Sequence, residues 1–468
     1  MPLIMRNYLD SINQSYPEGL LVLDDKVNPA AYEVTAILKQ LELAREFPAV
    51  YFTNPLNLKG EVSSFPLVTN IFATRERCAL ALGLESEHAK LPLSLEYARR
   101  EARFMPAETV PKNQAPVKDV VKSGEEVDLR EFPIVRHHDM DLAPYITMIV
   151  TMRDPENGAY NAAFQRAMYK GPRKLGLQMA PTQNWEIHRR NESAGRGTPT
   201  VIVVSHHPSF SLGALNIAPF ATSDYGVIGS IMNEPLRITT SETWGDDFLV
   251  PADADILIEG EVLPDVREIE APFGEYTGYF GPQVYRWVID VKAVSYRKDA
   301  IYQDIFVGHH ENWIMGAIPK EGSIYNSIKA VVPNVKGVCL PNSGCGRFNC
   351  YISIDKHVDG ESKMAALIAM GHVNFVKNAI VVDGDVDPFN EEEVMWSVAT
   401  RVQADEDVDI LKNVKGDVLD PSIKGDIMTT KMIVDATRPC EKPFPKRLEI
   451  PSDAMDRVKS ILESRKLI

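Results

Sequence analysis

Two glutamates, Glu270 and Glu275, flank a proline and a glycine in the run EAPFGEYTGY. Proline fixes its own φ and glycine reaches backbone conformations that other residues resist, so the run predicts a tight, rigid bend. Carboxyl groups held close together rarely share one pKa, which lets one stay ionised while the other exchanges a proton. The bend therefore predicts an acid-base site, and a solvated acidic turn is the alternative for the spacing alone.

Polar residues elsewhere in the middle of the chain could complete such a site. Arg166 ends the run NAAFQR, and its planar guanidinium could hold a carboxylate or pair with a glutamate. An arginine on the surface of a strand is the ordinary alternative. Side-chain oxygens and nitrogens also crowd the runs QMAPTQNWEIH, at 178–188, and SDYG, at 223–226.

The elements that must position these residues change in kind along the chain. In the middle, a hairpin at 145–153 and 160–168 and further strands at 200–204, 255–262, 286–296 and 301–306 predict a barrel or sandwich. The first part alternates strands at 20–23 and 49–53 with a helix from residue 28, which is typical of an α/β region. The last part returns to α/β, with helices at 363–370 and 391–402 around a strand at 379–383. Residues 106–128 are rich in Pro, Lys, Glu and Val and predict a linker.

Length and composition limit the class of protein. A chain of 468 residues exceeds the size of one hydrophobic core, so we expect two or three domains. A net charge of −15 without a basic run argues against a nucleic-acid partner. Apolar runs are too short for a signal peptide or a membrane span, so we expect a cytoplasmic protein with no membrane partner. Five scattered cysteines predict reduced thiols rather than a disulfide framework.

Taken in order, the motifs resemble those of the UbiD family of decarboxylases, which use a prenylated flavin. The resemblance covers essentially the whole chain. It is carried by N-x4-R at Asn161 and Arg166, by LVPADADILIEGEV, by EAPFGEYTGY, and by the late runs IVVDGDVDPFNEEEVMWSVATR and KMIVDATRP. It implies a multidomain α/β and α+β fold with three parts: an N-terminal α/β domain over 1–110, a flavin-binding split β-barrel over 111–315, and a C-terminal α/β domain over 316–468. An amphipathic tail helix from Arg457 would serve oligomerisation.

The resemblance also implies a role for each matched catalytic residue. Arg166 and Glu270 would form an ionic network near the substrate carboxylate, and Glu275 would donate the proton. The cofactor would be prenylated FMN, because loss of carbon dioxide from an sp2 carbon leaves a carbanion that side chains cannot stabilise. The reaction would be the reversible, non-oxidative decarboxylation of an unsaturated acid through a covalent adduct between substrate and flavin.

A metal site follows from the same resemblance. Asn161 matches a ligand of the divalent cation, usually Mn2+, that ties the flavin phosphate to the protein. The family's other two ligands are commonly His and Glu, and the corresponding positions here are Gln183 and Asp224. Both keep an oxygen that a hard cation accepts. Asn184 and His188 remain rivals for the Gln183 position, and the similarity further suggests K+ near Asp224.

The substrate is the least determined part of the prediction. His309 and His310, in the run GHHENW, stand where family members often place substrate-selecting residues, and they could hydrogen-bond a ring heteroatom or hydroxyl. Loop histidines with purely structural bonds are the alternative. We expect an aromatic or heteroaromatic acid, with a hydroxybenzoate or an acrylic acid as other candidates.

Other partners and other functions follow from the same comparison with the family. A flavin prenyltransferase would supply the cofactor, and the chain would form a homodimer or higher homo-oligomer. A flavin-dependent oxidoreductase on the same barrel would leave the paired glutamates without a task. A non-catalytic flavin-binding subunit would lack Arg166, Glu270 or Glu275, and all three are present.

Overall fold

The computed structural model describes residues 3–423 and 427–465. Its N-terminal region is built on a four-stranded sheet in the order β1-β2-β3-β16. Its elements before the barrel are α1 (Met5–Ser15), β1 (Leu20–Val27), α2 (Glu33–Leu43), β2 (Ala49–Pro55), β3 (Leu67–Thr69), α3 (Arg75–Ala81) and α4 (Leu91–Glu101). The strands predicted at 20–23 and 49–53 are β1 and β2, which pair in parallel. The predicted helix begins late, at Glu33, because Asn28 first caps a short 3-10 turn.

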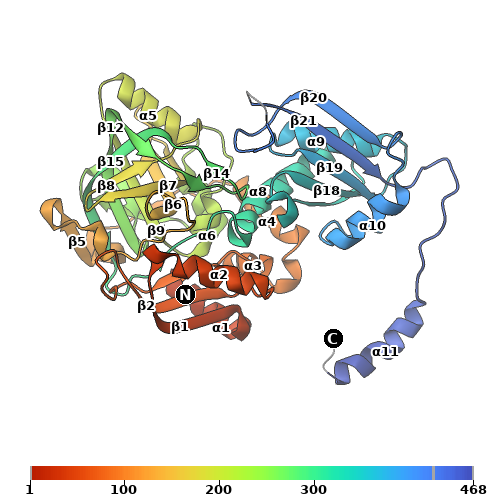
Figure 1. The fold of residues 1–468 in the computed structure, drawn as a ribbon, viewed down its shortest axis with the longest axis horizontal. Helices are drawn as coiled ribbons and strands as arrows, with labels where there is room; N and C mark the ends of the chain where they lie inside the picture. The colour runs from red at the N-terminus through yellow and green to blue at the C-terminus, as the bar shows by residue number, and fades with distance from the viewer. Residues whose placement is uncertain (1–2, 424–426, 466–468) are drawn as a thin grey trace.

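The middle part of the chain forms a closed barrel of six strands, which lies at the left in Figure 1. The ring runs β12-β9-β6-β7-β8-β15, and pairing of β12 with β15 closes it, while β5 is added outside β15. The strands are β5 (Val120–Ser123), β6 (Tyr145–Arg153), β7 (Tyr160–Gly171), β8 (Lys174–Leu177), β9 (Thr198–Ser205), β12 (Ile256–Glu270) and β15 (Val284–Tyr296). The predicted hairpin is β6 and β7, whose register places Thr147 opposite Arg166. Closure leaves the ring without a free edge.

Short helices and strands surround the barrel. They are β4 (Glu108–Thr109), α5 (Gln183–Ser193), α6 (Pro208–Gly213), α7 (Asp224–Met232), β10 (Arg237–Ser241), β11 (Gly245–Pro251), β13 (Phe273–Gly274), β14 (Phe280–Gly281) and β16 (Tyr302–Gln303). In Figure 1, α5 covers one end of the barrel and α6 lies near α4. Helices α5 and α7 begin within the polar runs at 178–188 and 223–226 that the sequence analysis named.

Two sequence predictions about connections are wrong. Residues 106–128 are not a linker, because β4 pairs with β10, β5 pairs with β15, and Val117 is fully buried between them. Their polar composition hides isolated valines that pack inward. The strand predicted at 301–306 shrinks to β16, which leaves the barrel and pairs in parallel with β3 of the N-terminal sheet.

The C-terminal region is a five-stranded sheet in the order β17-β18-β19-β21-β20, flanked by helices. Its elements are α8 (His310–Lys329), β17 (Val335–Cys339), β18 (Asn349–Ile354), α9 (Glu361–His372), β19 (Asn378–Asp383), α10 (Glu391–Arg401), β20 (Val408–Lys415), β21 (Met428–Ala436) and α11 (Ser452–Ser464). The helices and the strand predicted here correspond to α9, α10 and β19. Helix α8 lies between the barrel and this sheet, and α11 stands apart at the end of an extended segment (Figure 1). No described helix has both the length and the apolar character that crossing a bilayer requires.

Candidate active site

Arg166 lies between the two glutamates of the EAPFGEYTGY run. Its Nε and Nη2 donate to the two carboxylate oxygens of Glu270 at 2.8 and 3.1 Å, and its Nη1 donates to Glu275. The side chains of Arg166, Glu270 and Glu275 are 10%, 0% and 13% exposed. The structure thus brings together the three residues that the sequence nominated as catalytic, in an environment that water hardly reaches.

The bend at 270–275 directs the carboxylates of Glu270 and Glu275 toward the Arg166 guanidinium. Glu270 is the last residue of β12, and Ala271 then takes a φ of 68°, in the left-handed region that residues with a side chain seldom occupy. Glu275 follows β13, and its N–H donates to the carbonyl of Tyr279 at 2.9 Å. Between the acids, the ring of Phe273 lies 4.9 Å from the Arg166 guanidinium carbon.

Burial and neighbouring charges shift the pKa values of Glu275 and Arg166. Burial raises the pKa of Glu275, although the neighbouring Arg166 acts to lower it. Burial acts to lower the pKa of Arg166, but its hydrogen bonds to Glu270 and the charge of Glu275 outweigh that effect and raise it. Arg166 therefore stays cationic, and Glu275 is an acid that can hold a proton at a higher pH than an exposed glutamate.

A cavity of about 280 Å³ opens beside Arg166 and Glu275. It lies where the barrel, α8 and the C-terminal region meet, and aromatic and aliphatic side chains supply much of its wall. Its lining residues include Phe164, Gln165, Gln178, Phe273, Tyr276, Ile305, Asn312, Met315, Arg347 and Leu419. Among the described residues, the side-chain oxygens of Gln165, Gln178 and Asn312 are buried without a hydrogen-bond partner. Unpaired acceptors in an apolar-walled cavity suit a flat ligand that carries its own donors, and a flavin fits that description.

Asn161, near the start of β7, lies close to Asp224, which is the first residue of α7. Asp224 accepts a hydrogen bond from the N–H of Ala162 at 2.7 Å, and Asn161 donates to Asn184 at 2.8 Å. Asp224 is 3% exposed, and burial raises its pKa to about 7. No basic side chain forms an ion pair with it within the described part of the chain. A buried carboxylate without a cation, beside amide oxygens, fits a hard divalent metal.

The three candidates for the remaining ligand occupy different surroundings on α5. Gln183 donates to the carbonyl of Ala218 at 3.1 Å, whereas Asn184 is fully buried and bonded to Asn161. His188 faces elsewhere, since its Nδ1 bonds to Thr198 at 2.8 Å. Asn184 therefore touches the Asn161 side chain, and His188 does not. Over residues 3–423 and 427–465, no group of three or more His, Cys, Asp or Glu side chains could hold a metal ion, so any site here relies on amide oxygens.

The structure does not bring His309 and His310 into the cavity. His310 stacks on Phe47 with ring centroids 4.1 Å apart, and His309 is 2% exposed and packs on Phe306 at 5.1 Å. Burial lowers the pKa of both, to about 4 for His309, so both rings stay neutral. Both rings lie beside Phe47 of the N-terminal region, and His310 also contacts Asn342 at 3.1 Å. Asn312, further along α8, lines the cavity instead.

Sequence reasoning missed Arg347 and Tyr276 as parts of this cavity. Arg347 lies in the CGRFNC run, and its guanidinium carbon lies 4.3 Å from the Tyr276 ring centroid. Tyr276 directly follows Glu275, so its place beside that acid could have been read from the motif. The approach of Arg347 depends on how the C-terminal sheet meets the barrel, and no local pattern encodes that.

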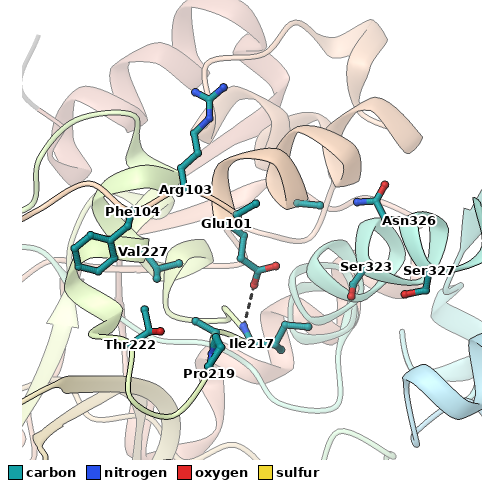
Figure 2. Close-up of a pocket in the computed structure, with 13 residues that line it drawn as sticks. Glu101, Arg103, Phe104, Ile217, Pro219, Thr222, Val227, Ser323, Asn326 and Ser327 are labelled. Carbon is teal, nitrogen blue, oxygen red and sulfur yellow. Dashed lines mark hydrogen bonds between the residues drawn. The ribbon is translucent and has the colours of Figure 1, made fainter. Parts of the chain in front are cut away.

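A second cavity, of about 600 Å³, lies between α4, α8 and the loop at 217–222. Figure 2 shows Glu101 at its centre, accepting a hydrogen bond from the N–H of Ile217 at 2.8 Å. Ser323 and Asn326 of α8 form the opposite wall. None of the residues nominated as catalytic lines this cavity.

Three protein-family models match consecutive parts of the chain. Each is described as a domain of 3-octaprenyl-4-hydroxybenzoate carboxy-lyase, UbiD: the N-terminal domain over 17–90, the Rift-related domain over 108–310 and the C-terminal domain over 313–436. The matches follow the three regions of the structure, and together they cover most of the chain.

Curated relatives and solved structures match the chain along nearly its full length. Anhydromevalonate phosphate decarboxylase of Methanothermobacter thermautotrophicus is 32% identical over 93% of this chain and 97% of the relative. Phenolic acid decarboxylase of Sedimentibacter hydroxybenzoicus is 28% identical over 95% of this chain and 94% of the relative. The UbiD-class enzyme HmfF of Pelotomaculum thermopropionicum, in complex with FMN, superimposes with a TM-score of 0.90 at 33% identity, covering 98% of this chain and 99% of that one. An evolved dimeric form of HmfF, in complex with prFMN, gives a TM-score of 0.87 at 31% identity, covering 98% of this chain and 99% of that one.

Proposed function

We infer the reaction from one premise, which is that the chain belongs to the UbiD family and is a carboxy-lyase of that type. On this premise we propose that it catalyses the reversible, non-oxidative decarboxylation of an aromatic or heteroaromatic, α,β-unsaturated acid. The observation that carries the proposal is the position of Arg166 between Glu270 and Glu275 on the wall of a cavity.

Each of the three side chains has a task in this reaction. Glu270 fixes the plane of the Arg166 guanidinium through two hydrogen bonds, so that the cation faces the substrate carboxylate in a set orientation. Arg166 holds the acid, and the apolar wall excludes water from it. Glu275, whose raised pKa favours a protonated carboxyl, delivers its proton to the carbon that carried the carboxylate.

We propose that the cavity holds prenylated FMN. When bound, this cofactor supplies the electron sink that side chains lack, by bonding covalently to the substrate. The unpaired oxygens of Gln165, Gln178 and Asn312 support the proposal, because they can accept hydrogen bonds from its ring and ribityl chain. The FMN and prFMN complexes of the HmfF structures support it as well.

Asn161 and Asp224 would bind Mn2+ or another divalent metal at the phosphate of the flavin, with Gln183 or Asn184 as the further ligand. The buried, cation-free carboxylate of Asp224 supports this assignment. A K+ ion near Asp224 is part of the same proposal. The divalent ion would tie the phosphate of the flavin to the protein.

The substrate class rests on the cavity wall and on the relatives. Phe164 and Phe273 offer flat, apolar faces that suit an aromatic ring, and Ile305 adds an aliphatic contact. The relatives are named for phenolic acids and for anhydromevalonate phosphate, so the family accepts both aromatic and non-aromatic acids. His309 and His310 would act on selectivity only indirectly, by fixing the start of α8 against Phe47.

We further propose that the chain divides near residues 110 and 315 and assembles as a homo-oligomer. The second boundary lies within α8, which belongs to both neighbouring regions. Helix α11 has no buried residue, and Met455, Val458 and Ile461 are 56%, 45% and 51% exposed. An apolar stripe on a projecting helix supports docking onto a second copy. A flavin prenyltransferase would be the partner that supplies the cofactor.

The experiment is to co-express the protein with a flavin prenyltransferase, record the absorption spectrum, and screen aromatic acids for deuterium incorporation at the carboxyl-bearing carbon. We expect carbon dioxide release and exchange without nicotinamide. A flavin-dependent oxidoreductase would instead need a hydride donor and would release no carbon dioxide. A flavin-loaded protein that exchanges no acid would contradict the proposal.

A further inference from the structure

We propose that Arg347 is a specificity-determining residue that binds a second anionic group of the substrate, away from the carboxylate that leaves. Arg347 lines the same cavity as Arg166 and Glu275 but comes from the loop between β17 and β18. The two cations therefore approach the cavity from the C-terminal region and from the barrel. This inference rests on the proposed function for the reacting carboxylate.

Arg347 has spare hydrogen-bonding capacity. Its Nη1 donates to the carbonyl of Cys345 at 3.1 Å, which uses one of the five N–H groups of a guanidinium. Among the residues that the structure describes, no carboxylate forms an ion pair with it. Arg166, by contrast, is shared between two glutamates. Of the two guanidiniums on this cavity, Arg347 is the one left to bind an added anion.

The Arg347 side chain is held in place before any ligand arrives. One face of its guanidinium lies over the Tyr276 ring, at 4.3 Å from the centroid. Tyr276 is itself fixed, because its hydroxyl donates to Asp417 and its carbonyl accepts from Trp313 at 2.7 Å. On α8, Gly316 makes room, since a Cβ there would lie 2.6 Å from Nη2 of Arg347. Such a fixed fork loses little freedom when it grips a carboxylate or phosphate.

The buried charge of Arg347 also favours an anionic ligand. Burial lowers the pKa of Arg347, which means that its charge is costly where it sits. The carboxylate of Asp417 is occupied by the Tyr276 hydroxyl rather than by the guanidinium. An anionic group in the cavity would offset that cost through charge-assisted hydrogen bonds. The substrate class is therefore an unsaturated acid with a second anion, either a carboxylate or a phosphate.

Calorimetric titration tests this assignment without requiring turnover. Benzoate, benzene-1,4-dicarboxylate and 4-(phosphonooxy)benzoate would be titrated into the FMN-loaded and the flavin-free protein. We expect at least one dianion to bind about tenfold more tightly than benzoate, which corresponds to about 1.4 kcal/mol. Whichever of the two dianions binds more tightly identifies the second anionic group as a carboxylate or a phosphate. If the protein decarboxylates no acid, the proposed function fails, but the preference for a dianion can still be measured by titration.

Four variants test which residue causes the preference for a dianion. Arg347→Gln should equalise the affinities, whereas Arg347→Lys should keep part of the difference. Gly316→Ala retains the charge but displaces the guanidinium, so it should also reduce the preference, and it offers a second route if Arg347→Gln folds poorly. Arg286→Gln, which removes a cation that does not line the cavity, should keep it. Absence of any dianion preference in the unmodified protein would overturn the proposal. So would an Arg347→Gln variant that keeps the preference but loses FMN.

Discussion

Arg166 donates to both carboxylate oxygens of Glu270, at 2.8 and 3.1 Å, and Glu270 is fully buried. This two-point contact joins β7 to the end of β12 across the barrel. A lysine could neutralise Glu270 but could not fix a plane, because its ammonium is a point donor. The pair therefore defines the orientation of the cation that faces the cavity.

Removing Arg166 should unfold the protein more easily, because it leaves the Glu270 charge buried without a partner. We expect Arg166→Ala to reduce the free energy of unfolding by about 3–5 kcal/mol in urea titrations, and Arg166→Lys to reduce it less. Arg189→Ala, which breaks an exposed pair with Glu186, is the matched control and should leave stability unchanged. Equal stability of Arg166→Ala and the unmodified protein would refute the structural role.

Glu275→Gln should remove turnover while flavin binding persists, because the amide keeps the shape but carries no transferable proton. A loss of about 10²–10⁴-fold in kcat is expected for a general acid. Glu268→Gln is the control, since Glu268 pairs with Lys174 outside the cavity. Full activity in Glu275→Gln would assign the proton transfer to another group.

The pH dependence of the rate should report the Glu275 carboxyl. Its pKa is raised above the usual 4.5 by burial, so the protonated form persists to higher pH than in an exposed glutamate. Activity should be present below the folded-state pKa and fall as the pH rises through it. A pH profile of kcat measures this limb. An unchanged limb in an active Glu275→Asp variant would show that another group titrates.

Mn2+ should raise the melting temperature of the flavin-free protein through Asp224. Ligand linkage gives about 2.7 kcal/mol when the metal is present at 100 times its Kd. Asp224→Asn removes the carboxylate and should abolish most of that shift in thermal melts. Asp255→Asn changes another buried acid, 3% exposed and hydrogen-bonded to Ser205, and should keep the shift. A shift of the same size in Asp224→Asn would place the metal elsewhere.

Charged substitutions on α11 should dissociate the oligomer. We expect the double variant Val458→Asp, Ile461→Asp to sediment as a smaller species than the unmodified protein, because both side chains are exposed on the helix that we propose docks onto a second copy. Lys459→Glu alters the charge of the same helix without touching its apolar side and serves as the control. An unchanged sedimentation coefficient in the double variant would remove α11 from the interface.

Much of this architecture could be predicted, because the signals are local. Two neighbouring strand-like runs at 145–153 and 160–168 predict the β6–β7 hairpin, and the Pro-Phe-Gly bend predicts the pair Glu270 and Glu275. What could not be predicted depends on packing between distant segments. The return of β16 to the N-terminal sheet, the burial of Val117 and the approach of Arg347 to Tyr276 join residues far apart in the chain.

Helix α8 is tethered to the N-terminal region at two points. Glu311 accepts from the N–H groups of Asn70 and Phe72 at 2.9 and 3.3 Å, and Glu321 pairs with Arg75 at 2.8 Å. The same helix presents residues to the cavity, so any tilt of its axis alters the room left for a substrate. Directed evolution of substrate range would therefore gain from varying these tethers, although their side chains do not line the cavity.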